Sequence, residues 1–179
     1  RTIYAACSKG HTDIVKCLLE VGVDPNVNSG SGTPIYTAAK SGHLDVVKLL
    51  VEYGADYKNV QGGFSPLFVA CTQGKLNVIK YLISRGANPH AFDNPPLVFI
   101  ACAAGYLDVV KYFIEELQYD INRTSGGVHA LKTDGKDTLL YVACQAKKED
   151  VAKYLFNEGA NLTKTITAQF TSIIAKLIQ

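Results

Sequence analysis

Residues 33–58 read TPIYTAAKSGHLDVVKLLVEYGADYK, and this stretch predicts two short helices joined by a glycine turn. Pro34 suits the first turn of a helix, because its missing N–H removes a donor that has no intrahelical partner there. Gly42 and Gly54 fall where each helix must stop, since glycine adopts the left-handed closing conformation most easily. Asp45 is favourable near the positive end of the second helix dipole. The stretch is therefore expected to form a helix pair.

The same pattern recurs along the chain at a nearly constant period. Equivalent segments begin at Arg1, Thr33, Ser65, Pro96 and Thr138, at spacings of 32, 32, 31 and 42 residues. The predicted units are residues 1–32, 33–64, 65–95, 96–137 and 138–164, and the long interval places an extended finger loop at residues 123–137. One helix pair cannot bury its own apolar face, so the units must stack on one another.

This repeat resembles the ankyrin repeat family, whose T-P-L-H-x-A motif and x-x-G-H turn are matched most closely by residues 33–43. The resemblance implies an all-α solenoid of stacked helix pairs, with short turn or hairpin fingers beside a concave face. It also implies that the finger asparagines Asn26 and Asn122 are candidates for hydroxylation by an oxygen-sensing dioxygenase.

Three features depart from the family pattern. An aromatic residue replaces the motif histidine in all five units, and we interpret this column as packing; it comprises Tyr4, Tyr36, Phe68, Phe99 and Tyr141. The fourth unit has Leu97 in place of the motif proline and lacks the glycine that closes the second helix. In the fifth unit Lys147 stands at the closing glycine of the first helix, which predicts either a strained left-handed lysine or a rearranged turn.

Residues 165–179 contain apolar side chains at helical spacing, from Ile166 to Ile178, and predict one amphipathic helix. It is expected to be a cap or the first helix of an incomplete sixth repeat, with a partner-binding segment as the alternative. The chain has no methionine, and we expect it to be a fragment of a longer protein that is monomeric as isolated.

Composition excludes several classes of protein. With 179 residues, 47% of them hydrophobic, and a formal charge of +2, the chain is not intrinsically disordered and shows no signal for binding nucleic acid. The longest apolar run, residues 97–104, is far shorter than the ~18 residues that a bilayer span requires.

The sequence offers no recognisable catalytic or metal-binding motif. Its five cysteines include no C-x-x-C pair, and four of them occupy a small-residue position of the first helix. Free cysteines favour a reducing compartment, and we expect a cytoplasmic location with the nucleus left open. The segment GGVHALKT, residues 126–133, lacks the glycine that precedes the lysine of a phosphate loop. We therefore predict a protein without enzymatic activity or cofactor.

The predicted function is a binding module for a protein or peptide, which can include other domains of the same chain. The alternatives are an intramolecular scaffold or regulatory domain and, less favoured, a small-ligand sensor. The candidate surface combines variable first-helix positions with finger residues: Thr37, Lys40, Ser41, Val60, Gln61, Val69, Thr72, Gln73, Phe92, Asp93, Ile100, Ala103, Ala104, His129, Val142 and Gln145. Val69, Ile100 and Val142 form either an exposed apolar strip, which would favour binding, or a strip partly buried under the fingers.

Overall fold

The computed structural model describes residues 2–30, 32–58, 65–90, 96–124, 138–162 and 170–178, and every regular element within them is helical. The chain divides into two compact units, Arg1–Pro89 and His90–Gln179. The first unit contains α1 (Thr2–Lys9), α2 (Thr12–Glu20), α3 (Pro34–Ser41), α4 (Leu44–Glu52), α5 (Pro66–Thr72) and α6 (Leu76–Ser84). The second contains α7 (Leu97–Ala104), α8 (Leu107–Lys111), η1 (Tyr112–Glu116), α9 (Leu139–Gln145), α10 (Glu149–Asn157) and α12 (Thr171–Ile178).

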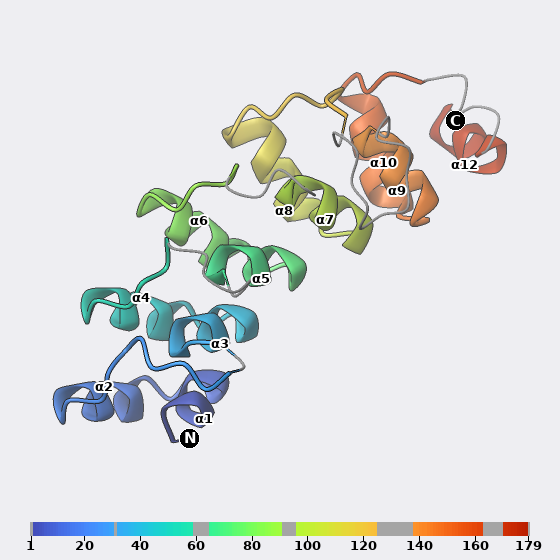
Figure 1. The fold of residues 1–179 in the computed structure, drawn as a ribbon. Helices are drawn as coiled ribbons and strands as arrows, with labels where there is room; N and C mark the ends of the chain where they lie inside the picture. The colour runs from blue at the N-terminus through green and yellow to red at the C-terminus, as the bar shows by residue number, and fades with distance from the viewer. Residues whose placement is uncertain are drawn as a thin grey trace. The chain divides into compact units, whose positions relative to one another are not determined.

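The helices of the first unit form three stacked pairs (Figure 1). Each first helix packs against its own second helix, α1 with α2, α3 with α4 and α5 with α6. The first helices α1, α3 and α5 also pack side by side, and so do the second helices α2, α4 and α6. The second unit repeats this arrangement, with α7 against α9 and α8 against α10. The expected all-helical repeat architecture is confirmed in both units.

Three first helices begin at a hydroxyl cap. The Oγ1 of Thr33 accepts a hydrogen bond from the Tyr36 N–H at 3.4 Å, and the Oγ of Ser65 accepts one from Phe68 at 3.2 Å. Thr138 caps α9 in the same way. A hydroxyl at this position satisfies one of the N–H groups that the first helical turn leaves without a partner.

The turn after the first helix requires glycine for two separate reasons. Gly42 and Gly105 have φ values of +85° and +86°, in the left-handed region that other residues rarely adopt. A Cβ on Gly42 would also lie 2.7 Å from Cδ of Lys75, and one on Gly105 would lie 2.8 Å from Cδ of Lys148. In both cases the side chain that fills this space comes from the next repeat, so the glycine allows close stacking as well as the turn.

Lys147 adopts the left-handed conformation at the same position of the fifth repeat, with φ +56°, which confirms the first of the two predicted arrangements. The turn keeps its hydrogen bonding, because the Lys148 N–H donates to the Ala143 carbonyl at 2.9 Å, as His43 does to Ala38 in the second repeat. Lys147 therefore has a strained backbone conformation, while the hydrogen-bonding pattern of the turn stays the same.

A one-residue insertion distorts the second helix of the fourth repeat. In the regular second repeat the Ala55 N–H donates to Leu50, five residues back. In the fourth repeat the Tyr119 N–H donates to Phe113, six residues back, and the helix from Tyr112 to Glu116 is π-helical. A π-helical turn holds one more residue than the α-helical turn that it replaces, so the insertion is absorbed without moving the flanking repeat positions.

The missing glycine of this repeat is replaced by Gln118, which takes the left-handed conformation with φ +52°. The next residue, Tyr119, is buried where the second, third and fifth repeats have Ala55, Ala87 and Ala160. Its ring stacks on His90 with centroids 6.4 Å apart, and the guanidinium of Arg123 lies 5.8 Å from the ring centroid. A larger side chain therefore fills the space at the base of this finger.

Helix α12 differs from the expected first helix of a sixth repeat. It packs against α10, the second helix of the fifth repeat, just as α6 packs against α4. It begins directly after Phe170, as α4 begins directly after His43. The sequence FTSIIAKLI at residues 170–178 also aligns with HLDVVKLLV at residues 43–51. By packing and by sequence, α12 corresponds to a second helix; residues 163–169 lie outside the described part of the chain.

Candidate binding surface

The first-helix face of the first unit carries side chains that change from one repeat to the next. Two positions near the end of each helix form this face: Ser8, Lys9, Lys40, Ser41, Thr72 and Gln73. Ser8, Lys9, Lys40 and Gln73 are exposed, and the other two are half-buried. Because α1, α3 and α5 pack side by side, these polar groups lie on neighbouring helices. The face combines hydroxyl and amide groups with two ammonium groups.

The corresponding positions of the second unit are less polar. They are Ala103 and Ala104 on α7, Gln145 on α9 and the following residue Ala146. Gln145 is exposed, whereas the three alanines are half-buried. This part of the predicted surface is therefore small-residue and nearly uncharged.

Of the two alternatives left open for the apolar strip, the exposed one does not hold at two of its three positions. Val69 is only 4% exposed and Val142 only 2%, while Ile100 is half-buried. Both valines lie one helical turn after the buried caps Ser65 and Thr138, and residues four apart lie on the same side of a helix. Ile100 follows the buried Pro96 by the same spacing but stays half-buried, so a buried cap alone does not set the exposure. Thr37, the predicted residue at the same position of the second repeat, is also half-buried.

Five predicted finger residues lie outside the described part of the chain: Val60, Gln61, Phe92, Asp93 and His129. Two described finger asparagines link neighbouring repeats instead. Asn26 donates from Nδ2 to the Gly54 carbonyl at 3.1 Å, and its Oδ1 accepts from the Asp56 N–H at 2.7 Å. In the second unit, Oδ1 of Asn122 accepts from the Asn161 N–H at 2.8 Å. Both asparagines hold the base of a finger to the next repeat.

The aromatic column belongs to the packing of the repeats, as predicted. Phe99 is fully buried, and Tyr4, Tyr36, Phe68 and Tyr141 are half-buried. The Tyr4 hydroxyl donates to the Val27 carbonyl at 2.6 Å. The Tyr141 ring meets Phe170 edge to face, with centroids 5.4 Å apart. These contacts engage the aromatic residues within the protein.

The buried cysteines are poorly suited to nucleophilic chemistry. Burial raises the pKa of Cys7 and Cys71 to about 12 and that of Cys144 to about 11, and it raises the pKa of Cys102 as well. Each thiol is thus held in its neutral form at neutral pH, whereas the thiolate is the nucleophile.

Neither a metal site nor a membrane span is found in the described residues. Among the side chains that the structure describes, no group of three or more His, Cys, Asp or Glu could hold a metal ion. Within the same residues, no helix is both long and apolar enough to cross a membrane.

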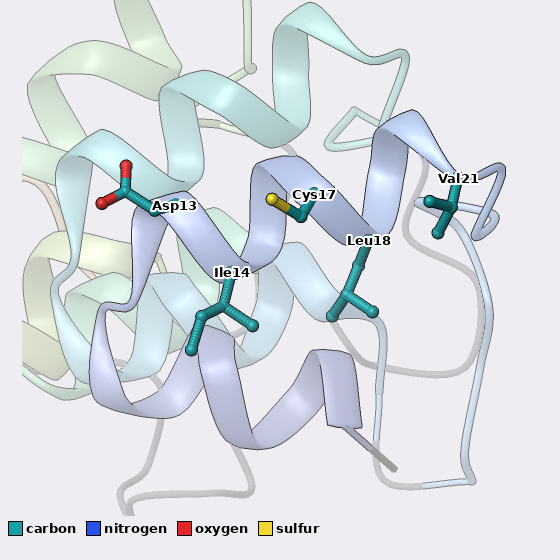
Figure 2. Close-up of a pocket in the computed structure, with 5 residues that line it drawn as sticks. All are labelled: Asp13, Ile14, Cys17, Leu18 and Val21. Carbon is teal, nitrogen blue, oxygen red and sulfur yellow. The ribbon is translucent and has the colours of Figure 1, made fainter.

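A second surface was not predicted from the sequence. On α2 and at its C-cap, five residues line an open, almost entirely apolar hollow (Figure 2): Asp13, Ile14, Cys17, Leu18 and Val21. The repeat register makes Ile14 and Leu18 core positions, so their sequence gives no sign of exposure. Their exposure becomes apparent when their burial is compared with that of the same positions in later repeats, and this comparison requires the structure.

Comparison with known proteins identifies the repeat. A family model of three ankyrin repeats matches residues 2–93, 58–125 and 92–166. The ankyrin repeat domain of human ASB11 matches with a TM-score of 0.76 and 26% identity, over 90% of this chain and 70% of that one. No curated protein matches the sequence. The helix pairs, their glycine turns and this family match together show that the chain belongs to the ankyrin repeat family.

Proposed function

We propose that the chain is a non-catalytic interaction module that binds a protein or peptide through the first-helix face of residues 1–89. Ankyrin repeats are generally protein–protein interaction modules and typically lack catalytic activity. The observation that carries the proposal is the contrast between two kinds of position in α1, α3 and α5. Positions such as Ala38 and Ala70 repeat and are buried, whereas Ser8, Lys40 and Thr72 occupy one position and change it from a hydroxyl to an ammonium group and back.

This contrast favours binding because stacking does not constrain the variable positions. A residue that packs the same neighbour in each repeat is expected to recur, while a residue that faces outward is free to fit a partner. Lys9 and Lys40 are exposed, and no hydrogen bond or ion pair joins either ammonium group to a described residue. A partner with an acidic side chain flanked by polar groups would complement this face. A reducing compartment, and the cytoplasm in particular, is part of the same proposal.

The test compares two double charge reversals on different helices, and of the four lysines Lys16 also forms an ion pair, with Glu20 at 3.9 Å. The variant Lys9→Glu/Lys40→Glu changes the first-helix face, and the control Lys16→Glu/Lys48→Glu makes the same change on the second helices α2 and α4. All four lysines are exposed. After equal thermal midpoints are established, each protein is used for quantitative affinity capture from an extract of its source cells.

The expected result is a partner that the wild type and the control retain and the Lys9→Glu/Lys40→Glu variant loses. Affinity should fall at least about tenfold, the scale of removing one charged contact at an interface. Equal loss from both variants would indicate a general effect of charge. Retention by both would exclude the first-helix face of residues 1–89 as the binding site.

A further inference from the structure

The first helices of residues 1–89, with the turns that follow them, carry positive charge and no negative charge. They comprise residues 2–11, 33–43 and 65–75, and none of these segments contains Asp or Glu. Their basic side chains are Lys9, His11, Lys40, His43 and Lys75. The acidic side chains of residues 1–89 all lie on the second helices or in the fingers: Asp13, Glu20, Asp24, Asp45, Glu52 and Asp56. Charge is therefore segregated, and the proposed binding face lies on the positive side.

The helix dipole does not account for this segregation. Its negative end favours a lysine in the last turn, as in α1 and α3. Its positive end favours acidic residues in the first turn, and α2 and α4 have Asp13 and Asp45 there. The first turns of α1, α3 and α5 contain no acidic residue. A partner that carries negative charge would explain their exclusion, because a carboxylate on this face would repel it.

Lys75 brings a third ammonium group to the same face. Its side chain extends from the third repeat across Gly42, with Cδ 2.7 Å from where a Cβ of Gly42 would lie. Because Gly42 directly follows α3, the Lys75 side chain lies beside the end of the helix that carries Lys40. Within the described ranges no ion pair includes Lys9, Lys40 or Lys75. These three residues are called the lysine row below.

The spacing of the lysine row fits one conformation of a bound peptide. Helices α1 and α3 pack side by side (Figure 1), and packed helices lie about 8–10 Å apart. A polyproline II peptide has about three residues per turn and rises about 3.1 Å per residue, so side chains at positions i and i+3 project from the same side about 9 Å apart. A β-strand is a poorer fit, because every regular element in the described part of the chain is helical and offers no strand edge for pairing.

We propose that the lysine row binds a partner segment in the polyproline II conformation that carries carboxylates at positions i and i+3. One carboxylate would pair with Lys9 and the other with Lys40 and Lys75. The inference rests on the proposed function and names the chemistry that the binding face selects. Nucleic acid is a poorer partner, because base stacking needs open aromatic faces and Tyr4, Tyr36 and Phe68 are half-buried packing residues.

Peptide selection tests the spacing of the carboxylates. A phage library of random peptides is selected on the 179-residue chain, and peptides that also bind the Lys9→Glu/Lys40→Glu variant are discarded. We expect the retained sequences to contain Asp or Glu at i and i+3 more often than at i and i+1 or at i and i+2. Retained sequences without this preference would overturn the inference and leave the proposed function standing, because they still bind through the first-helix face. A selection that yields no peptide would also overturn the inference, whereas the capture of a folded partner is measured separately.

Single substitutions then test the individual contacts by fluorescence polarisation of the best peptide, labelled with fluorescein. Replacing either acidic residue by its amide should weaken binding at least about tenfold, the scale of one charged contact. Lys75→Gln, which keeps an aliphatic chain over Gly42, should also weaken binding, while the control Lys48→Gln on α4 should not. Equal effects of these two variants would overturn the proposal. Displacement of the peptide by single-stranded oligothymidylate as readily as by unlabelled peptide would indicate a general polyanion site, with the same consequence.

Discussion

Replacing Lys147 by glycine is expected to stabilise the fold, and the size of the gain can be worked from the backbone. Lys147 has φ +56°, and the left-handed conformation costs a residue with a Cβ about 1–2 kcal/mol. Glycine avoids that cost but loses about 0.5–1 kcal/mol more conformational entropy on folding. The net gain in the free energy of unfolding should therefore be roughly 0.5–1 kcal/mol.

Lys147→Ala is the control that isolates the backbone. Alanine removes the ammonium group and the aliphatic chain but keeps the Cβ, so the left-handed strain remains. Lys147 is exposed, and no described ion pair includes it, so losing the rest of its side chain should have little effect. Urea unfolding followed by circular dichroism, supported by thermal scans, compares the three proteins. A gain of this size should raise the thermal midpoint by about 1–4 °C.

The decisive comparison is glycine against alanine. If Lys147→Gly is no more stable than Lys147→Ala, the left-handed backbone does not cost what the reasoning requires. The reverse exchange, Gly105→Lys, tests the same position where stacking is close. It should destabilise by more than about 1 kcal/mol, because it adds left-handed strain and brings a Cβ to 2.8 Å from Cδ of Lys148.

Three further perturbations test other features of the fold. Gln118→Gly should raise the free energy of unfolding by about 0.5–1 kcal/mol, because Gln118 also has a left-handed backbone. Urea unfolding compares this variant with Gln118→Ala, and an equal effect of both variants would contradict the prediction. Asn26→Ala should lower the free energy of unfolding by about 1–2 kcal/mol and accelerate amide exchange at Asp56, because the substitution removes two hydrogen bonds between repeats. Unchanged exchange at Asp56 would show that these hydrogen bonds contribute nothing. Stability should also fall as the pH rises from about 9 towards 12: burial raises the pKa of Cys71 from 9.0 to about 12, so its thiol ionises first in the unfolded chain. This group contributes a slope of up to about 1.4 kcal/mol per pH unit. Cys71→Ala, which introduces the residue that α3 has at the equivalent position Ala39, should reduce that slope, and an identical pH profile would exclude the Cys71 thiol as its source.

The sequence was sufficient for the helix pairs because each is specified locally. Proline or a hydroxyl starts the first helix, glycine ends it, and the apolar spacing fixes which side is buried, as in α3 and α4. Repetition then supplies the stacking partner. At Lys147 the register left two arrangements open, a left-handed lysine or a rearranged turn, and the structure has the first of them.

Surface exposure was harder to predict, because it depends on neighbours that are distant in sequence. Val69 follows a buried cap and faces inward, although its position is occupied by the exposed Ala5 in α1. Ile14 shows the opposite difference. Its position in the repeat predicts a core residue, yet its side chain is 48% exposed because no described helix covers it. The π-helical turn of the fourth repeat was missed for a local reason, since an inserted residue looks the same whether a loop or a helix absorbs it.

The two ends of the repeat series therefore present different chemistry to a neighbour. At α2 the apolar side chains of Ile14 and Leu18 are partly exposed, although the aligned residues Val46 and Leu50 of α4 are buried. In the fifth repeat, Lys147 occupies the position that closes the first helix. The second and fourth repeats have glycine there, which lets the side chain of a lysine from the next repeat lie close. An open hollow remains beside it, lined by residues that include Lys147 and Phe170. A neighbour that stacks as Lys148 does on Gly105 would meet the Lys147 side chain, and at the position aligned with Lys148 this chain has the aromatic residue Phe170, followed by α12, which packs on α10 as α6 packs on α4.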